Sequence, residues 1–144
     1  MNQTISYVAD TNLLIDYYRG VDKAKEYIQK LKSGEIKLAV SVVTETEIWV
    51  GIKDDEELLK WVNLLDEFFE SVDVNSNIAR KAGEIWKEFG HYMGKTADTD
   101  FRNIPDAFIA ATCNILDRAL ITANLKHFIQ LINKGILKCE SYKT

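Results

Sequence analysis

The stretch ISYVADTNLL (residues 5–14) decides the fold class, because a short apolar segment passes directly into a helical pattern. Residues 5–9 predict a buried strand, and Asp10 and Thr11 then open a segment whose apolar residues recur at helical spacing. The same passage from a strand pattern to a helical pattern recurs at residues 36–51 and 119–133. Strands separated by helices predict an α/β fold: a central, mostly parallel sheet of four to five strands with helices on both faces.

The remaining elements follow from the same two periodicities. The predicted strands are 5–9, 36–42, 71–74, 119–122 and 136–139. The predicted helices are 10–20, 24–34, 44–51, 55–69, 78–89, 105–117 and 125–133. The polar stretch 90–103 has no clear periodicity, which indicates a loop or insertion. Because no repeat or linker interrupts the pattern, we expect one domain over residues 1–144.

Composition narrows the class of protein. The 144 residues are 47% hydrophobic and 28% charged, which predicts a globular domain rather than a disordered chain. No apolar stretch is long enough for a membrane span, no signal peptide is visible, and two cysteines are too few for a disulfide framework. We therefore expect a cytoplasmic protein. The net charge of −4 argues against a basic nucleic-acid coat protein, but an acidic site holding a divalent cation can still attract phosphate.

Four polar residues occupy corresponding places in the predicted fold. Asp10 follows the first strand, and Glu47 lies in the first turn after the second. Asp106 lies in the first turn of the helix that Pro105 opens, and Asn124 follows the strand 119–122. Carboxyl ends of parallel strands share one edge of the sheet with helix N-termini, and ligands bind there. The topology therefore predicts that these four residues lie close together.

Each residue also has a purely structural interpretation. Asp10 suits an N-cap, Glu47 completes a capping box with Thr44, Asp106 complements a helix dipole, and Asn124 suits a turn. Their combination favours chemistry instead, because two carboxylates about 4 Å apart repel by ~4 kcal/mol at an effective dielectric constant of about 20. Either their pKa values rise or a cation binds. Ligands that are all oxygen suit Mg²⁺ or Mn²⁺.

Four segments carry a resemblance to a known family. In chain order they are YVADTNLLID (7–16), SVVTETEIWVG (41–51), IPDAFIAATC (104–113) and LITANLKHF (120–128). They resemble the D-T-N opening, the T-x-x-E-[IL]-x-x-G segment, the D-A-x-I-A-A helix and the T-x-[ND]-x-x-[HD]-F segment of PIN-domain ribonucleases. Within that family the sequence looks like the VapC-type toxins of toxin–antitoxin pairs.

The resemblance implies an Mg²⁺- or Mn²⁺-dependent endoribonuclease. Its catalytic and metal-binding acids would be Asp10, Glu47 and Asp106. Its supporting polar residues would be Asn12, Thr122 and Asn124. Asn124 stands where many members have a fourth aspartate, and because an amide carries no charge, the number of metal ions stays open. The resemblance also implies a homodimer and an antitoxin protein whose tail covers the acidic site.

Several further side chains flank the predicted edge. Arg102, Lys126 and His127 are candidates for contacts with the substrate, although scattered surface cations are common. Trp49, Trp61 and Trp86 lie at helical core spacings, which predicts packing rather than base stacking.

Two other functions stay open at this stage. A non-catalytic PIN-like module could bind RNA or protein without cutting. A phosphotransferase could use Asp10 as a covalent nucleophile, but that chemistry needs a second acid two residues on, where this chain has Asn12.

Overall fold

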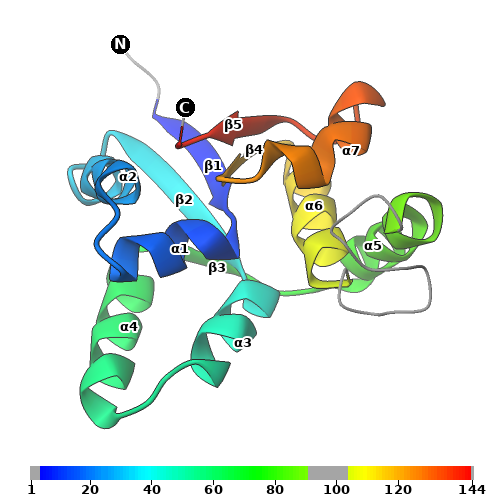
Figure 1. The fold of residues 1–144 in the computed structure, drawn as a ribbon. Coiled ribbons are helices and arrows are strands. Elements are labelled where there is room, and N and C mark those ends of the chain that lie inside the picture. The colour runs from blue at the N-terminus through cyan, green and yellow to red at the C-terminus, as the bar shows by residue number, and fades with distance from the viewer. Residues whose placement is uncertain (1–3, 91–103, 144) are drawn as a thin grey trace.

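The computed structural model describes residues 4–90 and 104–143 of the chain. In that part, five parallel strands form one sheet in the order β3-β2-β1-β4-β5 (Figure 1). The strands are β1 (Ile5–Ala9), β2 (Ile36–Ser41), β3 (Glu70–Val72), β4 (Ala119–Thr122) and β5 (Cys139–Ser141). The predicted α/β fold with a parallel sheet is confirmed.

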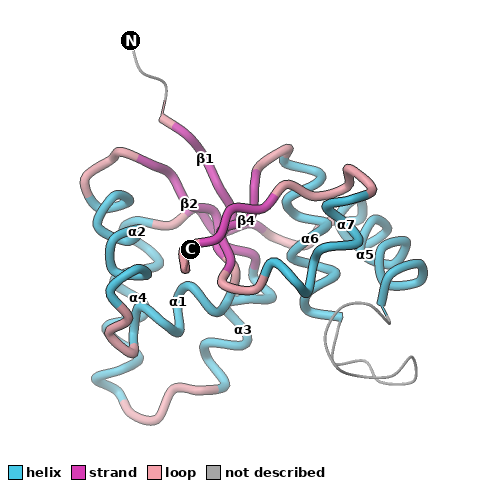
Figure 2. The backbone as a smooth tube through the Cα atoms, turned by 45° about the horizontal axis from the view of Figure 1, so that its top comes forward, coloured by secondary structure: helices cyan, strands magenta, loops and turns pink. Residues whose placement is uncertain are grey.

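Helices cover both faces of the sheet, as predicted (Figures 1 and 2). On one side lie α1 (Thr11–Tyr18), α2 (Asp22–Lys32) and α4 (Asp55–Phe68). On the other lie α5 (Ser76–Phe89), α6 (Ile104–Leu116), the 3₁₀ helix η3 (Leu125–Phe128) and α7 (Ile129–Asn133). The helix α3 (Val42–Val50) follows β2 directly. None of the helices in the described ranges is long and apolar enough to cross a membrane.

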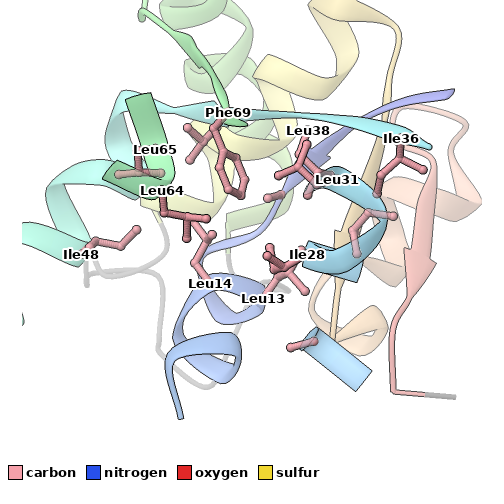
Figure 3. Packing of buried hydrophobic residues seen from close by; sticks show 14 of the residues in the cluster. Leu13, Leu14, Ile28, Leu31, Ile36, Leu38, Ile48, Leu64, Leu65 and Phe69 are labelled. Carbon is pink, nitrogen blue, oxygen red and sulfur yellow. The ribbon is translucent and has the colours of Figure 1, made fainter. Parts of the chain in front are cut away.

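Two hydrophobic cores result from the alternation of side chains along the strands. Val8 and Leu120 face the core formed with α5 and α6, whereas their neighbours Ala9 and Ile121 face the core formed with α1, α2 and α4. Figure 3 shows Leu13 and Leu14 of α1 among the side chains of this second core. Both leucines are fully buried. Burial of this kind stabilises the fold by roughly 1.5–3 kcal/mol for each side chain and fixes α1 against the sheet.

Helix α3 begins at the residue after β2, and α1 begins one residue further on from β1, after Asp10. Asp10 caps α1 by accepting a hydrogen bond from the backbone N–H of Thr11, and Ser41 caps α3 by accepting from that of Val43. The purely structural alternative for Glu47, a capping box with Thr44, does not form, because Ser41 is the N-cap of α3. Because α3 begins at Val42 rather than Thr44, Glu47 lies in the second turn of the helix, not the first.

The last strand begins later than predicted. Gly135, with a φ of +73°, turns the chain after α7, and the N–H of Ile136 donates to the carbonyl of Leu131 at 3.0 Å. Most of the predicted strand at 136–139 is therefore the irregular segment that follows this turn. Pairing with β4 starts where Cys139 lies beside Leu120.

The prediction that all three tryptophans pack in the core is wrong for Trp49. Trp61 is buried and Trp86 is partly buried, but Trp49 is 42% exposed. It lies in the last turn of α3, which extends beyond the edge of the sheet (Figure 1).

Candidate active site

The site lies at the carboxyl ends of β1 and β4, where the strand order reverses direction. The backbone N–H of Asp10 donates to the carbonyl of Ile121 at 3.0 Å, which brings the residue after β1 beside the end of β4. Thr122 then donates its hydroxyl hydrogen to Oδ2 of Asp10 at 2.7 Å, while the N–H of Thr11 donates to Oδ1 at 2.8 Å. Both carboxylate oxygens are held, and Asp10 is only 5% exposed.

The electrostatic environment of Asp10 disfavours its charge. The pKa of Asp10 is raised from 3.8 to about 6, and burial is the largest cause. The hydrogen bonds from Thr122 and Thr11 lower the pKa, whereas the charges of Asp106 and Glu47 raise it further. The hydrogen bonds therefore fix the carboxylate without fully compensating its charge. A cation bound beside Asp10 would supply that compensation.

Glu47 reaches the site from α3. Its Oε1 accepts a hydrogen bond from the Thr11 hydroxyl at 2.9 Å, although the residue is partly exposed to solvent. Partial desolvation raises the pKa of Glu47, the bond from Thr11 opposes the rise, and the negative charge of Asp106 adds to it. Thr11 therefore contacts two acids, Asp10 through its backbone and Glu47 through its side chain.

Asp106 lies in the first turn of α6 and pairs with a histidine. The Nδ1 of His127 is 3.7 Å from Oδ2 of Asp106, and the two side chains are 37% and 27% exposed. The hydrogen bond and charge of Asp106, with a smaller effect of Asp10, raise the pKa of His127 against the effect of burial. His127, a candidate substrate contact from the sequence, thus lies beside a predicted catalytic acid.

The remaining predicted residues take different places. Asn124 donates its backbone N–H to the hydroxyl of Thr122 at 3.0 Å, so it supports the hydroxyl that holds Asp10. Oδ1 of Asn12 accepts from the N–H of Ala123 at 3.4 Å, which joins α1 to the chain after β4. Lys126 is exposed on the neighbouring 3₁₀ helix. The predicted contact by Arg102 falls outside the described residues.

Two functional candidates were missed by sequence reasoning. Thr11 was treated as part of a three-residue motif and Thr44 as a cap, yet the two hydroxyls lie 3.0 Å apart beside Glu47. The only signal in the sequence was their spacing, one residue after Asp10 and three residues before Glu47.

The donor set suits a hard cation. Within residues 4–90 and 104–143, no three His, Cys, Asp or Glu side chains are close enough to enclose one ion. Mg²⁺ is commonly bound through one or two carboxylates, with water and substrate phosphate completing its shell. The charges of Asp106 and Glu47 raise the pKa of Asp10, the charge of Asp106 raises that of Glu47, and all three side chains offer only oxygen ligands. These residues therefore fit a metal held by two acids and water.

Comparison with known proteins agrees with this architecture. The PIN domain family matches residues 7–131. The chain is 27% identical over 122 residues to "Ribonuclease VapC19" of Mycobacterium tuberculosis, covering 83% of this chain and 89% of that protein. It is 30% identical to a chain in the "Toxin-antitoxin complex from Klebsiella pneumoniae", with a TM-score of 0.66 and coverage of 85% and 89%.

A more distant structure supports the fold alone. The structure of "VapBC2 from Rickettsia felis bound to a DNA fragment from their promoter" superposes with a TM-score of 0.72 at 18% identity, covering 95% of this chain and 98% of that one. The resemblance inferred from the four sequence segments is thus confirmed at the level of the whole domain. The chain belongs to the PIN domain family, and its relatives include VapC ribonucleases.

Proposed function

We propose that this protein is a metal-dependent endoribonuclease and the toxin of a toxin–antitoxin pair. The observation that carries the proposal is the buried Asp10 carboxylate, held by two hydrogen bonds at the switch point of the sheet with the charges of Glu47 and Asp106 acting on it. The similarity of the chain to VapC19, which is named a ribonuclease, and to a chain of the Klebsiella toxin–antitoxin complex supports the same function.

In this proposal Asp10 and Asp106 hold Mg²⁺ or Mn²⁺, with Glu47 acting directly or through water. The bound ion supplies Lewis-acid stabilisation of phosphate charge and lowers the pKa of water. The reaction is hydrolysis: the oxygen of water bonds to phosphorus, the bond between phosphorus and the 3′-oxygen breaks, a carboxylate of the site accepts a proton from the water, and the leaving 3′-oxygen takes up a proton from solvent. Because the 3′-oxygen leaves and no 2′-hydroxyl takes part, the product would carry a 5′-phosphate.

The neighbouring residues orient these groups. Thr122 holds one oxygen of Asp10 and is itself held by the N–H of Asn124, so the carboxylate keeps one orientation. His127, beside Asp106, and the exposed Lys126 supply positive charge where a phosphate backbone would approach. We propose both as substrate contacts, together with Arg102.

We further propose a homodimer and a protein antitoxin as partners, by analogy with the toxin–antitoxin complex. A groove between α1, α2 and α4 combines aromatic and basic side chains, and offers a surface on which a partner segment could bind. It is lined by residues that include Tyr17, Trp61, Phe68, Lys25 and Lys32. Because the proposed substrate is cellular RNA, we place the activity in the cytoplasm.

The direct test is cleavage of RNA by the purified chain without its antitoxin. We expect cleavage of a mixed RNA pool with Mg²⁺ or Mn²⁺, none with EDTA, and loss of at least about 100-fold in rate for Asp106→Asn. Asp117→Asn is the matched control, because it makes the same change on an exposed residue just after α6, with a positive φ that asparagine tolerates. It should cut like the wild type.

The alternatives give different results. If the metal raises the melting temperature but the wild type cuts no RNA in the pool, the non-catalytic binding module is favoured. If a phosphate is trapped covalently on Asp10, the phosphotransferase is favoured. Equal cleavage by the wild type and Asp106→Asn would refute the assignment of the site.

A further inference from the structure

Three side chains form a hydrogen-bonded row between α1 and α3. The Thr44 and Thr11 hydroxyl oxygens are 3.0 Å apart, and the Thr11 hydroxyl is 2.9 Å from Oε1 of Glu47. Thr44 and Glu47 are three residues apart on α3, so they share a face of that helix. Thr11, the first residue of α1, lies between them.

The donors in this row can be assigned from the number of protons. An ionised carboxylate only accepts hydrogen bonds, so the single proton of the Thr11 hydroxyl must point to Glu47. The bond between the two threonines then requires Thr44 to donate to Thr11. Thr44 is 0% exposed and Thr11 is 8% exposed, so solvent has little access to replace either partner.

Thr44 is the third residue of α3, so the residue four positions before it, Val40, lies in β2 and not in the helix. The hydroxyls of Thr46 and Thr112 donate to carbonyls four residues back in their own helices, those of Val42 and Phe108, at 3.0 Å and 2.8 Å. The hydroxyl of Thr44 instead contacts a side chain of another helix. This contact points to a role toward Glu47 rather than within α3.

We propose that Thr11 and Thr44 are positioning residues that fix the Glu47 carboxylate relative to Asp10. Thr11 is the link, because its N–H donates to Asp10 at 2.8 Å while its hydroxyl donates to Glu47 at 2.9 Å. Thr44 fixes the direction in which the Thr11 hydroxyl donates. The proposal rests on the proposed function, since Glu47 is one of the acids of the nuclease site.

The test compares Thr44→Val, which keeps the shape and removes the hydroxyl, with Thr44→Ser, which keeps the hydroxyl. On a defined RNA oligonucleotide with Mn²⁺, we expect Thr44→Val to lower kcat by about 10-fold or more, with KM changed little. Thr44→Ser should recover most of the loss. Thr112→Val is the control, because it removes an equally buried hydroxyl that bonds within its own helix.

A second measurement separates this proposal from the proposed function. In crystal structures of the wild type and Thr44→Val, we expect the Glu47 carboxylate to move away from Thr11 in the variant only. If Glu47 stays in place, or if Thr44→Val and Thr112→Val lower kcat equally, the proposal is wrong. If the wild type cuts no RNA, the proposed function fails, while the position of Glu47 still decides the positioning role. Should Thr44→Val not fold, Thr11→Ser and Thr11→Val give the same comparison.

Discussion

Asp10 and Asp16 lie at opposite ends of α1, and their surroundings differ in one decisive respect. Both are buried, at 5% and 9% exposed, and each accepts a short hydrogen bond from a hydroxyl, Thr122 at 2.7 Å and Tyr142 at 2.6 Å. Asp16 also has a cation, because the Nζ of Lys143 is 3.2 Å from its Oδ2. The charged groups that shift the pKa of Asp10 are Asp106 and Glu47, both acids.

The two carboxyl groups therefore titrate in opposite directions. Burial raises the pKa of both, but at Asp16 the bonds from Tyr142 and Lys143, with the charges of Lys143 and Arg19, outweigh burial and lower it. At Asp10 the pKa rises to about 6. Asp16 is thus compensated by groups of the chain itself, whereas the charged groups that act on Asp10 are acids, which agrees with the cation proposed for that site. The difference between the two aspartates is tested by three variants that each remove one charge: Asp10→Asn, Asp16→Asn and Lys143→Gln.

The largest effect is expected for Asp10→Asn, which should stabilise the metal-free protein. At about 1.4 kcal/mol for each pKa unit, the rise from 3.8 to about 6 corresponds to a cost of about 3 kcal/mol when Asp10 is ionised. Protonation of Asp10 favours the folded state below pH 3.8, and this contribution is lost as the pH rises through about 6. In urea denaturation with EDTA, the free energy of unfolding of Asp10→Asn should exceed that of the wild type by up to about 3 kcal/mol at pH 8. This difference should disappear toward pH 4.

Mg²⁺ supplies the control for this variant. Because the proposed metal site needs the Asp10 carboxylate in the folded chain, Mg²⁺ should stabilise the wild type more than Asp10→Asn and reduce the difference in the free energy of unfolding at pH 8. A variant that is less stable than the metal-free wild type at pH 8 would show that Asp10 is compensated within the chain.

Local patterns were sufficient to predict much of this architecture. The bounds of β1 and β4 were predicted to the residue, because each is a short apolar segment ending at a polar residue. The approach of Asp10 to Thr122 follows from parallel pairing, since Ala9 lies beside Ile121. Topology alone therefore carried the prediction of where the site lies.

The difference between the two aspartates was beyond sequence reasoning. Asp16 and Tyr142 are 126 positions apart in the chain, and no periodicity links them. The Thr11–Thr44 contact likewise joins two helices through side chains whose rotamers are set by packing. Such contacts depend on the assembled tertiary structure, which is also why the turn before β5 was taken for a strand.

A smaller effect of the opposite sign is expected for Asp16→Asn. Removing the charge weakens the bonds from Tyr142 and Lys143, which should lower the free energy of unfolding by about 1–2 kcal/mol at pH 7. Because the folded pKa of Asp16 is lowered, its stabilisation is present above 3.8 and is lost as the pH falls through the folded value. Urea denaturation at pH 7 and pH 3 measures the difference in the free energy of unfolding between the wild type and Asp16→Asn, which should be smaller at pH 3. A more stable variant at pH 7 would contradict the assignment of Asp16 as a compensated acid.

The smallest effect is expected for Lys143→Gln, which removes the cation but leaves the Tyr142 bond. The side chain of Lys143 is 49% exposed, and ion pairs at such positions contribute less than about 1 kcal/mol. The loss should shrink further in 1 M NaCl, where charges are screened within about 3 Å. If Lys143→Gln lowers the free energy of unfolding as much as Asp16→Asn does, the ion pair with Lys143 rather than the Tyr142 hydroxyl stabilises Asp16. The contrast with Asp10 would then come from the nearby cations, chiefly Lys143, since Asp10 has an equally short hydroxyl bond.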